Sequence, residues 1–137
     1  MTITIINGPN LNLLGVREPS VYGSEGFDTY LGELRAKFPE IRFEYFQSNV
    51  EGELINELQR AGFASDAIIL NPGGYTHTSV AIGDAIAAIP APVIEVHISN
   101  VHAREAFRHL SHVSGKAKGT IAGLGLKGYE LAVRYFL

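Results

Sequence analysis

The stretch Ala67-Ile68-Ile69-Leu70, followed by the polar cluster NPGGYTHTS at Asn71–Ser79, decides the fold class of this chain. Neighbouring side chains of a strand point to opposite faces, so an unbroken apolar run fits a strand that is buried on both faces. Strands of that kind are typical of the centre of a parallel sheet. The stretch therefore predicts a central parallel strand with polar residues at its carboxyl end.

Other apolar runs on both sides of this stretch have the length and pattern of strands. The run Ile41-Arg42-Phe43-Glu44-Tyr45 alternates between apolar and polar residues, as an edge strand does. Five strands are predicted, at Thr2–Ile6, Ile41–Phe46, Ala67–Leu70, Pro92–Ile98 and about Lys118–Ala122.

Segments with a helical period lie between the strands, because their apolar residues recur on one face. Ser48-Asn49-Val50-Glu51 has the pattern of a capping box, and Gly62 fits the end of the helix that it would begin. Three apolar faces are formed by Phe27, Leu31, Leu34 and Phe38, by Leu54, Ile55 and Leu58, and by Ile82, Ala85, Ile86 and Ile89; two further helices are predicted near Ala103–Leu110 and Tyr129–Phe136.

Alternation of strands and helices predicts an α/β fold: a doubly wound parallel sheet of five strands with helices on both faces. In the flavodoxin-like strand order 2-1-3-4-5, ligands bind in the crevice between strands 1 and 3, where the order reverses. The chain has 137 residues, enough for one domain with its own core, and contains no internal repeat or linker. We therefore expect a single domain, residues 1–137.

The composition narrows the class of function. Hydrophobic residues make up 46% and charged residues 18%, which suggests that some surface is buried between subunits. The net charge of −3 gives no indication of nucleic-acid binding. The absence of cysteine excludes disulfides, thiolate catalysis and cysteine-held metals. No apolar run resembles a signal peptide or a membrane span, so we expect a cytoplasmic protein.

Three polar clusters follow predicted strands. Asn7–Tyr22 follows the first strand, Asn71–Ser79 the third, and His97-Ile98-Ser99-Asn100 ends the fourth. Because the carboxyl ends of these parallel strands meet at one edge of the sheet, we expect the clusters to line one pocket. The first is far longer than the usual loop of about two to six residues, and we expect a lid loop at about residues 11–26.

Glu95 and His97 lie two positions apart on the fourth strand and therefore point to the same face. Buried ionisable groups are costly unless they are paired. A carboxylate behind a histidine fixes its tautomer and stabilises the imidazolium ion, as a general acid requires. A core histidine with satisfied hydrogen bonds is the alternative, but the position at the end of a strand favours a role in the site.

The residues after this strand suggest an anion site. Ser99 or Asn100 can cap the helix predicted to follow, which would leave the backbone N–H groups of Ile98 and Ser99 near a helix N-terminus. Such N–H groups favour a carboxylate or a phosphate. An ordinary helix cap is the alternative.

Arg17 and Tyr22 lie together in the long loop, and Arg108 lies on the predicted fourth helix. For a tyrosine to act as a base near pH 7, its pKa must fall by roughly 3 units, or ~4 kcal/mol. Neighbouring guanidinium groups would lower it in that way. An ordinary arginine and tyrosine on a surface loop is the alternative.

Three other patterns do not form a site. The GLGLKG motif at residues 123–128 matches G-x-G-x-x-G, but no βαβ unit and no acidic residue about 20 positions on follow it, so it predicts a tight turn. His109 and His112 lack a third ligand for zinc. Asn7 and Asn71 stand where a phosphate-accepting receiver domain has acidic residues. No metal or nucleotide cofactor is therefore indicated.

Four blocks of this chain resemble type II 3-dehydroquinate dehydratase of the shikimate pathway. They are INGPNLNLLGVREPSVYG at Ile6–Gly23, SNVEG at Ser48–Gly52, NPGGYTHTS at Asn71–Ser79 and EVHISNVHAREAFR at Glu95–Arg108. Their order and spacing match the family along essentially the whole chain. The resemblance implies a flavodoxin-like catalytic domain without cofactor or metal, a dodecamer built from trimers, and a place in chorismate and aromatic amino acid biosynthesis.

The resemblance also implies a reaction, the loss of water from 3-dehydroquinate to give 3-dehydroshikimate by anti elimination through an enolate. Tyr22 would take the proton from C2, and Arg17 on the lid would help to keep that tyrosine ionised. His97, supported by Glu95, would protonate the departing C1 hydroxyl. Asn10 would position a water that stabilises the enolate.

For substrate binding, the resemblance implies that the ring hydroxyls are bound by Asn71, His77 and Arg108. It implies that the carboxylate is held by the backbone of Ile98 and Ser99. Asp84 would be inserted at the site by a neighbouring subunit. Gly83, beside Asp84, departs from the larger residue that is frequent in the family.

Two other classes of function stay open. One is a non-catalytic flavodoxin-like binding module for a small polyhydroxy carboxylic acid, and the other is a structural assembly unit. Tyr22, Arg17 and His97 argue against the binding module, since binding alone requires neither a base nor an acid. A Schiff-base route is not favoured either, because every lysine falls away from the strand ends. The lysines are Lys37, Lys116, Lys118 and Lys127.

Overall fold

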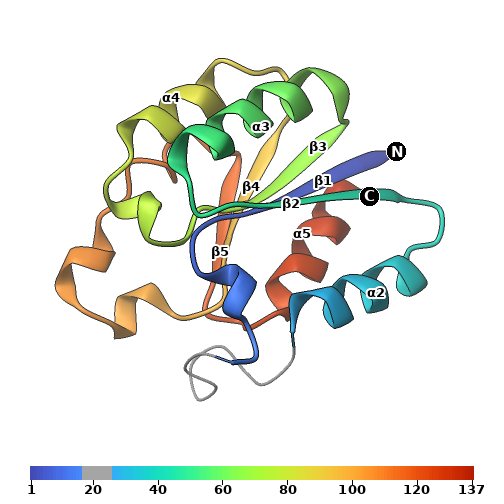
Figure 1. Cartoon of the computed structure of the whole chain (residues 1–137), viewed down its shortest axis with the longest axis horizontal. Coiled ribbons are helices and arrows are strands. Elements are labelled where there is room, and N and C mark those ends of the chain that lie inside the picture. Colours follow the sequence, from blue (N-terminus) through green and yellow to red (C-terminus); the bar gives the residue numbers. More distant parts are fainter. Residues whose placement is uncertain (17–25) are drawn as a thin grey trace.

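Five parallel strands form one sheet in the order β2-β1-β3-β4-β5 (Figure 1), as the sequence predicts. The computed structural model describes residues 1–16 and 26–137. The order reverses between β1 and β3, which lie side by side although β2 intervenes in the sequence. The strands are β1 (Thr2–Asn7), β2 (Arg42–Gln47), β3 (Ala67–Asn71), β4 (Val93–His97) and β5 (Gly119–Ala122).

Helices cover both faces of the sheet. In Figure 1, α2 and α5 lie on one face, and α3 and α4 lie on the other. Within the described residues the α-helices are α2 (Phe27–Lys37), α3 (Glu51–Ala64), α4 (Val80–Ala87) and α5 (Lys127–Phe136). All four were predicted in these places, and the prediction of a doubly wound α/β fold is confirmed.

The central strand β3 has the unbroken apolar pattern because each of its faces is covered. Ile69 packs into the core with α2 and α5, whereas Ile68 and Leu70 pack into the core with α3 and α4. The edge strand β2 differs, since Phe43 is buried while Arg42 is exposed. The unbroken apolar pattern of β3 thus corresponds to burial on both faces, and the alternating pattern of β2 to burial on one face.

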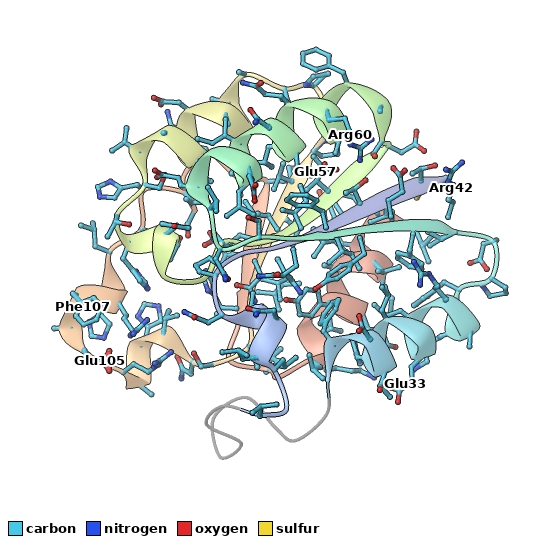
Figure 2. All side chains as sticks on the ribbon, in the orientation of Figure 1. Glu33, Arg42, Glu57, Arg60, Glu105 and Phe107 are labelled. Atoms are coloured by element: carbon cyan, nitrogen blue, oxygen red, sulfur yellow. The ribbon has the colours of Figure 1, made fainter. Side chains whose placement is uncertain are left out.

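The prediction of a helix near Ala103–Leu110 is wrong. Two short 3-10 helices stand there instead, η3 (Val101–Ala103) and η4 (Ala106–His109), with extended backbone at Arg104 between them. Phe107 is 60% exposed and lies at the outer edge of the molecule (Figure 2). A short helix needs an apolar face packed against the protein, and this segment has none.

The predicted start and end of α3 are also wrong. The residue before the helix is Val50, and the Ser48 hydroxyl accepts from the Val50 N–H and donates to Glu53, so no capping box with Glu51 forms. Gly62 lies inside the helix rather than at its end. Ile89 packs directly against it, which leaves no space for a larger side chain.

Part of the predicted lid loop is anchored to the core. Leu11 and Leu14 are buried, and Leu11–Leu13 forms the 3-10 helix η1, although the sequence shows no helical period here. Residues 17–25 of this loop, Arg17 and Tyr22 among them, lie outside the described residues. No helix in the described ranges is long and apolar enough to cross a membrane.

We expect Gly62→Ala to destabilise the protein. A Cβ at this position would overlap the Ile89 side chain, whose nearest atom is its own Cβ and so cannot move aside without the backbone. Overpacking of this kind costs about 1–3 kcal/mol of unfolding free energy, measurable by urea denaturation at fixed protein concentration.

Gly32→Ala is the matched control, because nothing lies within 4 Å of a Cβ built at Gly32 in the middle of α2. That substitution should raise the unfolding free energy by about 0.4–1 kcal/mol. Equal effects of the two substitutions would contradict the packing role of Gly62.

Candidate active site

A cavity of about 120 Å³ opens at the carboxyl end of the sheet, where β1, β3 and β4 end. The described parts of the three polar clusters meet there as predicted, at the point where the strand order reverses. The residues that line it are Pro9, Asn10 and Leu11 after β1, Asn71, Gly73, Gly74 and His77 after β3, and His97, Ile98, Ser99, Val101, Arg104 and Arg108 at and after β4.

The predicted pair of Glu95 and His97 is formed at this cavity. His97 Nε2 lies 2.5 Å from Glu95 Oε2. Glu95 is fully buried, and His97 is 8% exposed and lines the cavity. With Nε2 bonded to the carboxylate, Nδ1 is the ring nitrogen that remains for a ligand. The pair therefore has the geometry of a carboxylate-supported acid or base.

Three hydroxyl groups complete the surroundings of Glu95. Thr76 Oγ1 donates to Glu95 Oε2 at 2.6 Å, Ser114 Oγ to Oε1 at 2.5 Å, and Thr120 Oγ1 to Oε1 at 3.4 Å. Burial alone would raise the pKa of Glu95, but the hydrogen bond and charge of His97 and the donors Ser114 and Thr76 outweigh it and hold the pKa below its usual range. Glu95 is therefore a charged group in the interior.

A second buried network holds the ends of β1 and β3. Tyr129 on α5 donates to Asn7 Oδ1 at 2.7 Å and accepts from Asn71 Nδ2 at 3.0 Å. Asn71 Oδ1 accepts from the N–H of Gly73 at 3.0 Å. Burial raises the pKa of Tyr129, so it stays a neutral hydroxyl. The network fixes the Asn71 side chain at the cavity, and no pattern in the sequence predicts the part that Tyr129 has in it.

Asn10 stands at the cavity with a backbone angle φ of 71°, the one positive value among the described residues other than glycine. Asparagine tolerates this left-handed conformation better than most residues. The Asn10 N–H donates to Asn49 Oδ1 at 3.0 Å, and the carbonyl of Asn49 accepts from the Tyr75 hydroxyl at 2.8 Å. The segment after β2 therefore holds the turn that carries Asn10.

Basic side chains line the cavity on the side of η3, η4 and a further 3-10 helix, η2 (Gly73–His77). His77 Nδ1 donates to the carbonyl of Leu110 at 2.7 Å, which leaves Nε2 for a ligand. The Arg108 guanidinium contacts Glu105 at 2.5 Å and lies 4.9 Å from the centroid of the Phe107 ring. Arg104, which sequence reasoning missed, also lines the cavity. Two guanidinium groups favour an anionic ligand here.

At Ile98 and Ser99, positive charge comes from an arginine side chain rather than from the helix N-terminus that the sequence predicts. Asn100 does cap the following segment, since its Oδ1 accepts from the His102 N–H at 3.1 Å. That segment is a 3-10 helix of three residues, too short for a helix dipole to matter. Arg104 Nη1 donates to Ser99 Oγ at 3.3 Å instead, which places a positive charge beside these residues.

Asp84 does not line the cavity of its own chain. It is exposed on α4. The neighbouring Gly83 is buried, and a Cβ built there would overlap the carbonyl oxygen of His112. A larger residue at position 83 would therefore require the segment around His112 to shift.

The remaining sequence patterns are placed away from the cavity. None of the four lysines lines it. The glycine motif forms a turn, with φ of 88° at Gly123 and 64° at Gly125. Within residues 1–16 and 26–137, no three His, Asp or Glu side chains gather in a way that could hold a metal ion.

Comparisons with known proteins identify relatives over nearly the whole chain. The family model for Dehydroquinase class II matches residues 1–137. A 3-dehydroquinate dehydratase from Caldicellulosiruptor bescii is 53% identical over 134 residues, which cover 96% of this chain and 92% of that protein. A catabolic 3-dehydroquinase 2 from Neosartorya fischeri is 52% identical over 136 residues, covering 98% and 91%. The crystal structure of a type II dehydroquinase from Butyrivibrio crossotus superposes with a TM-score of 0.95 at 46% identity, covering 98% and 96%.

The buried Glu95 should make stability depend on pH. Its pKa is lowered in the folded protein from an ordinary value of 4.5, so the ionised carboxylate contributes stability above that pH and loses it as the pH falls through the folded value. Glu95→Gln should lower the unfolding free energy at pH 7 by about 1–3 kcal/mol, because the NH₂ group of the new amide would face hydroxyl groups that now donate to the carboxylate. The deficit should shrink below about pH 4.5 in denaturation series at several pH values.

Glu33→Gln is the control, because Glu33 is exposed on α2 (Figure 2). It should stay within about 0.5 kcal/mol of wild type at every pH. A Glu95→Gln deficit that is constant down to pH 3 would mean that folding does not lower the pKa of Glu95.

Proposed function

The chain belongs to the class II dehydroquinases, and we propose that it removes water from 3-dehydroquinate to give 3-dehydroshikimate. The family match over residues 1–137 and relatives named for this reaction support the proposal. The observation that carries it is the pair of His97 and buried Glu95 at the mouth of a cavity lined by amide and guanidinium groups. Loss of a hydroxyl group from a ring needs a proton donor of this kind.

We propose that His97 protonates the departing C1 hydroxyl. Glu95 stabilises the imidazolium form because the carboxylate is charged, buried and within hydrogen-bond distance. Its Nε2 is held by Glu95, so the proton given to the substrate comes from Nδ1. As the hydroxyl leaves with that proton, the C1–O bond breaks and the electrons of the enolate form the C1–C2 double bond.

The base in this proposal is Tyr22, which takes the proton from C2 to form the enolate, while Arg17 lowers the tyrosine's pKa. Both residues lie outside the described ranges, and their roles rest on the match to the family's first block. Asn10 would position a water against the enolate oxygen, and its place at the cavity is consistent with that role. The proposed geometry is anti, with base and acid on opposite sides of the ring.

Substrate binding is proposed for residues that line the cavity. Asn71, His77 and Arg108 would bind the ring hydroxyls, and the backbone at Ile98 and Ser99 would bind the carboxylate. The Nε2 of His77 and the second N–H of Asn71 Nδ2 are in keeping with this proposal, since neither is used in the hydrogen bonds described above. Arg104 adds positive charge next to the proposed carboxylate position.

Assembly and cellular role are further parts of the proposal. We expect a dodecamer built from trimers in which Asp84 of one subunit reaches the cavity of the next, and its exposure on α4 is compatible with that. A cytoplasmic enzyme of the shikimate pathway is expected. Quinate breakdown is the other role, because one relative is named a catabolic enzyme.

The proposed reaction is tested by following ultraviolet absorbance of the conjugated enone carboxylate when 3-dehydroquinate meets the purified protein. A parallel sample is pretreated with borohydride in the presence of 3-dehydroquinate, which would trap a lysine imine. Equal rates in both samples are expected. No absorbance change, with binding still seen by calorimetry, would leave a binding module and remove the enzymatic proposal.

We expect Tyr22→Phe to abolish turnover while it largely preserves ligand binding, because the phenyl ring keeps the shape but cannot accept a proton. Steady-state rates and calorimetry with 3-dehydroshikimate measure the two properties. Tyr135→Phe, which removes an exposed hydroxyl on α5, is the control and should leave both unchanged. Wild-type turnover in Tyr22→Phe would remove Tyr22 from the role of base.

A further inference from the structure

Glu95 accepts more hydrogen bonds than it would need in order to hold the imidazole of His97. His97 and Thr76 share its Oε2, while Ser114 and the more distant Thr120 reach its Oε1. Thr76 comes from η2 (Gly73–His77), Ser114 from the loop before β5, and Thr120 from β5. Three separate segments therefore direct hydroxyl groups at one buried carboxylate.

Counting protons fixes the direction of these hydrogen bonds. The Thr76 hydroxyl has one proton, which it donates to Glu95 Oε2. The contact of 2.6 Å between Thr76 Oγ1 and Ser111 Oγ must then be supplied by the Ser111 proton. Ser111 Oγ in turn accepts from the N–H groups of Val113 and Ser114, at 3.0 and 2.9 Å. The chain therefore runs one way, from backbone N–H through two hydroxyl groups to the carboxylate.

A neutral Glu95 does not fit this arrangement. A protonated carboxyl would have to donate a hydrogen bond, yet the hydroxyl and imidazole groups around it already donate toward it. If the Thr76 hydroxyl were rotated to accept from a protonated Glu95, its own proton would point at Ser111 Oγ. That oxygen already accepts hydrogen bonds from two backbone N–H groups. Donors that converge on an oxygen stabilise its charged form and hold the group in one orientation.

We propose that Thr76, Ser111 and Ser114 form a hydroxyl relay that keeps Glu95 ionised and aimed at His97, and so act as positioning residues for the acid step. The inference rests on the function proposed above. None of the three lines the cavity of Asn10 and Asn71, although all three line an adjoining cavity of about 470 Å³ behind His97. Thr76 and Ser114 donate to Glu95 directly and Ser111 donates to Thr76, so each is placed to act through Glu95. Their positions lie 16 to 19 residues from Glu95 in sequence and carry no motif.

Other titratable groups lie on the elements packed around this pair. On the same side of the sheet are His77 on η2, Asp84 on α4, and His112 and Lys116 in the loop before β5, with Arg108 at the cavity. In the described part of the chain, His97 is the titratable side chain that is hydrogen-bonded to Glu95. The protonation of Glu95 therefore depends on His97 and on the hydroxyl groups.

The test compares Thr76→Val, which keeps the shape without the hydroxyl, with Thr76→Ser, which keeps the hydroxyl. The first readout is the ¹³C titration of the Glu95 carboxyl by NMR, which needs no turnover. The second is the pH profile of kcat and kcat/KM with 3-dehydroquinate. Thr76→Val should move the Glu95 titration to higher pH and lower kcat roughly tenfold with little change in KM, since one charge-assisted hydrogen bond is lost.

Thr76→Ser should restore both the titration and the rate, and Ser114→Ala should repeat the effects of Thr76→Val from the other carboxylate oxygen. Ser79→Ala is the control for general loss of stability. Ser79 is also buried and close by in sequence, but its hydroxyl accepts from the Ile82 N–H at the start of α4. It should lower the unfolding free energy and leave the titration of Glu95 in place.

The outcomes separate this inference from the proposed function. A wild-type protein that does not turn over 3-dehydroquinate removes the enzymatic proposal, while the NMR titration still decides the relay. A Glu95 titration that is the same in wild type, Thr76→Val and Ser114→Ala overturns the relay, whatever the rates. A shift that Thr76→Ser does not restore also overturns it, because the shift would then come from altered packing.

Discussion

The buried carboxylate of Glu95, in the fourth strand of a parallel sheet, is the constraint on which the rest of the site depends. A charge with no exposure to solvent costs several kcal/mol unless donors replace the lost water. Here η2, the loop before β5 and β5 itself each supply a donor, and His97 supplies another. The segment before β5 brings Ser114 to Glu95 and Ser111 to Thr76. The charge that results lies beside the imidazole of His97 at the cavity.

A second polar network holds the opposite side of the pocket. Tyr129 joins Asn7 and Asn71, which end the adjacent strands β1 and β3, to helix α5 behind the sheet. Polar groups buried in this way rigidify a site because each lost hydrogen bond would leave an unsatisfied partner. The cavity is thus held from both faces of the sheet.

The fold was predictable because hydrophobic period reports burial directly, and burial is what places strands and helices. The site was predictable in part, since Glu95, His97, Asn71 and the loop ends follow from strand order. Thr76, Ser114 and Tyr129 were not, because a single hydroxyl has no period and its partners lie 19 to 122 residues away. The helix predicted near Ala103–Leu110 failed for a related reason: Phe107 and Leu110 are both exposed, so no apolar face packs this segment against the core. Tyr22 and Arg17 stay predictions.

The central claim is that His97, charged with the help of Glu95, protonates the leaving hydroxyl after a separate base has formed the enolate. Solvent exchange at C2 of 3-dehydroquinate in His97→Ala, followed by proton NMR in D₂O, tests it most directly. The account predicts that deuterium enters C2 of recovered substrate while little 3-dehydroshikimate forms, because the enolate arises but its hydroxyl cannot leave. Product formation at the wild-type rate, or loss of exchange together with loss of product, would contradict it.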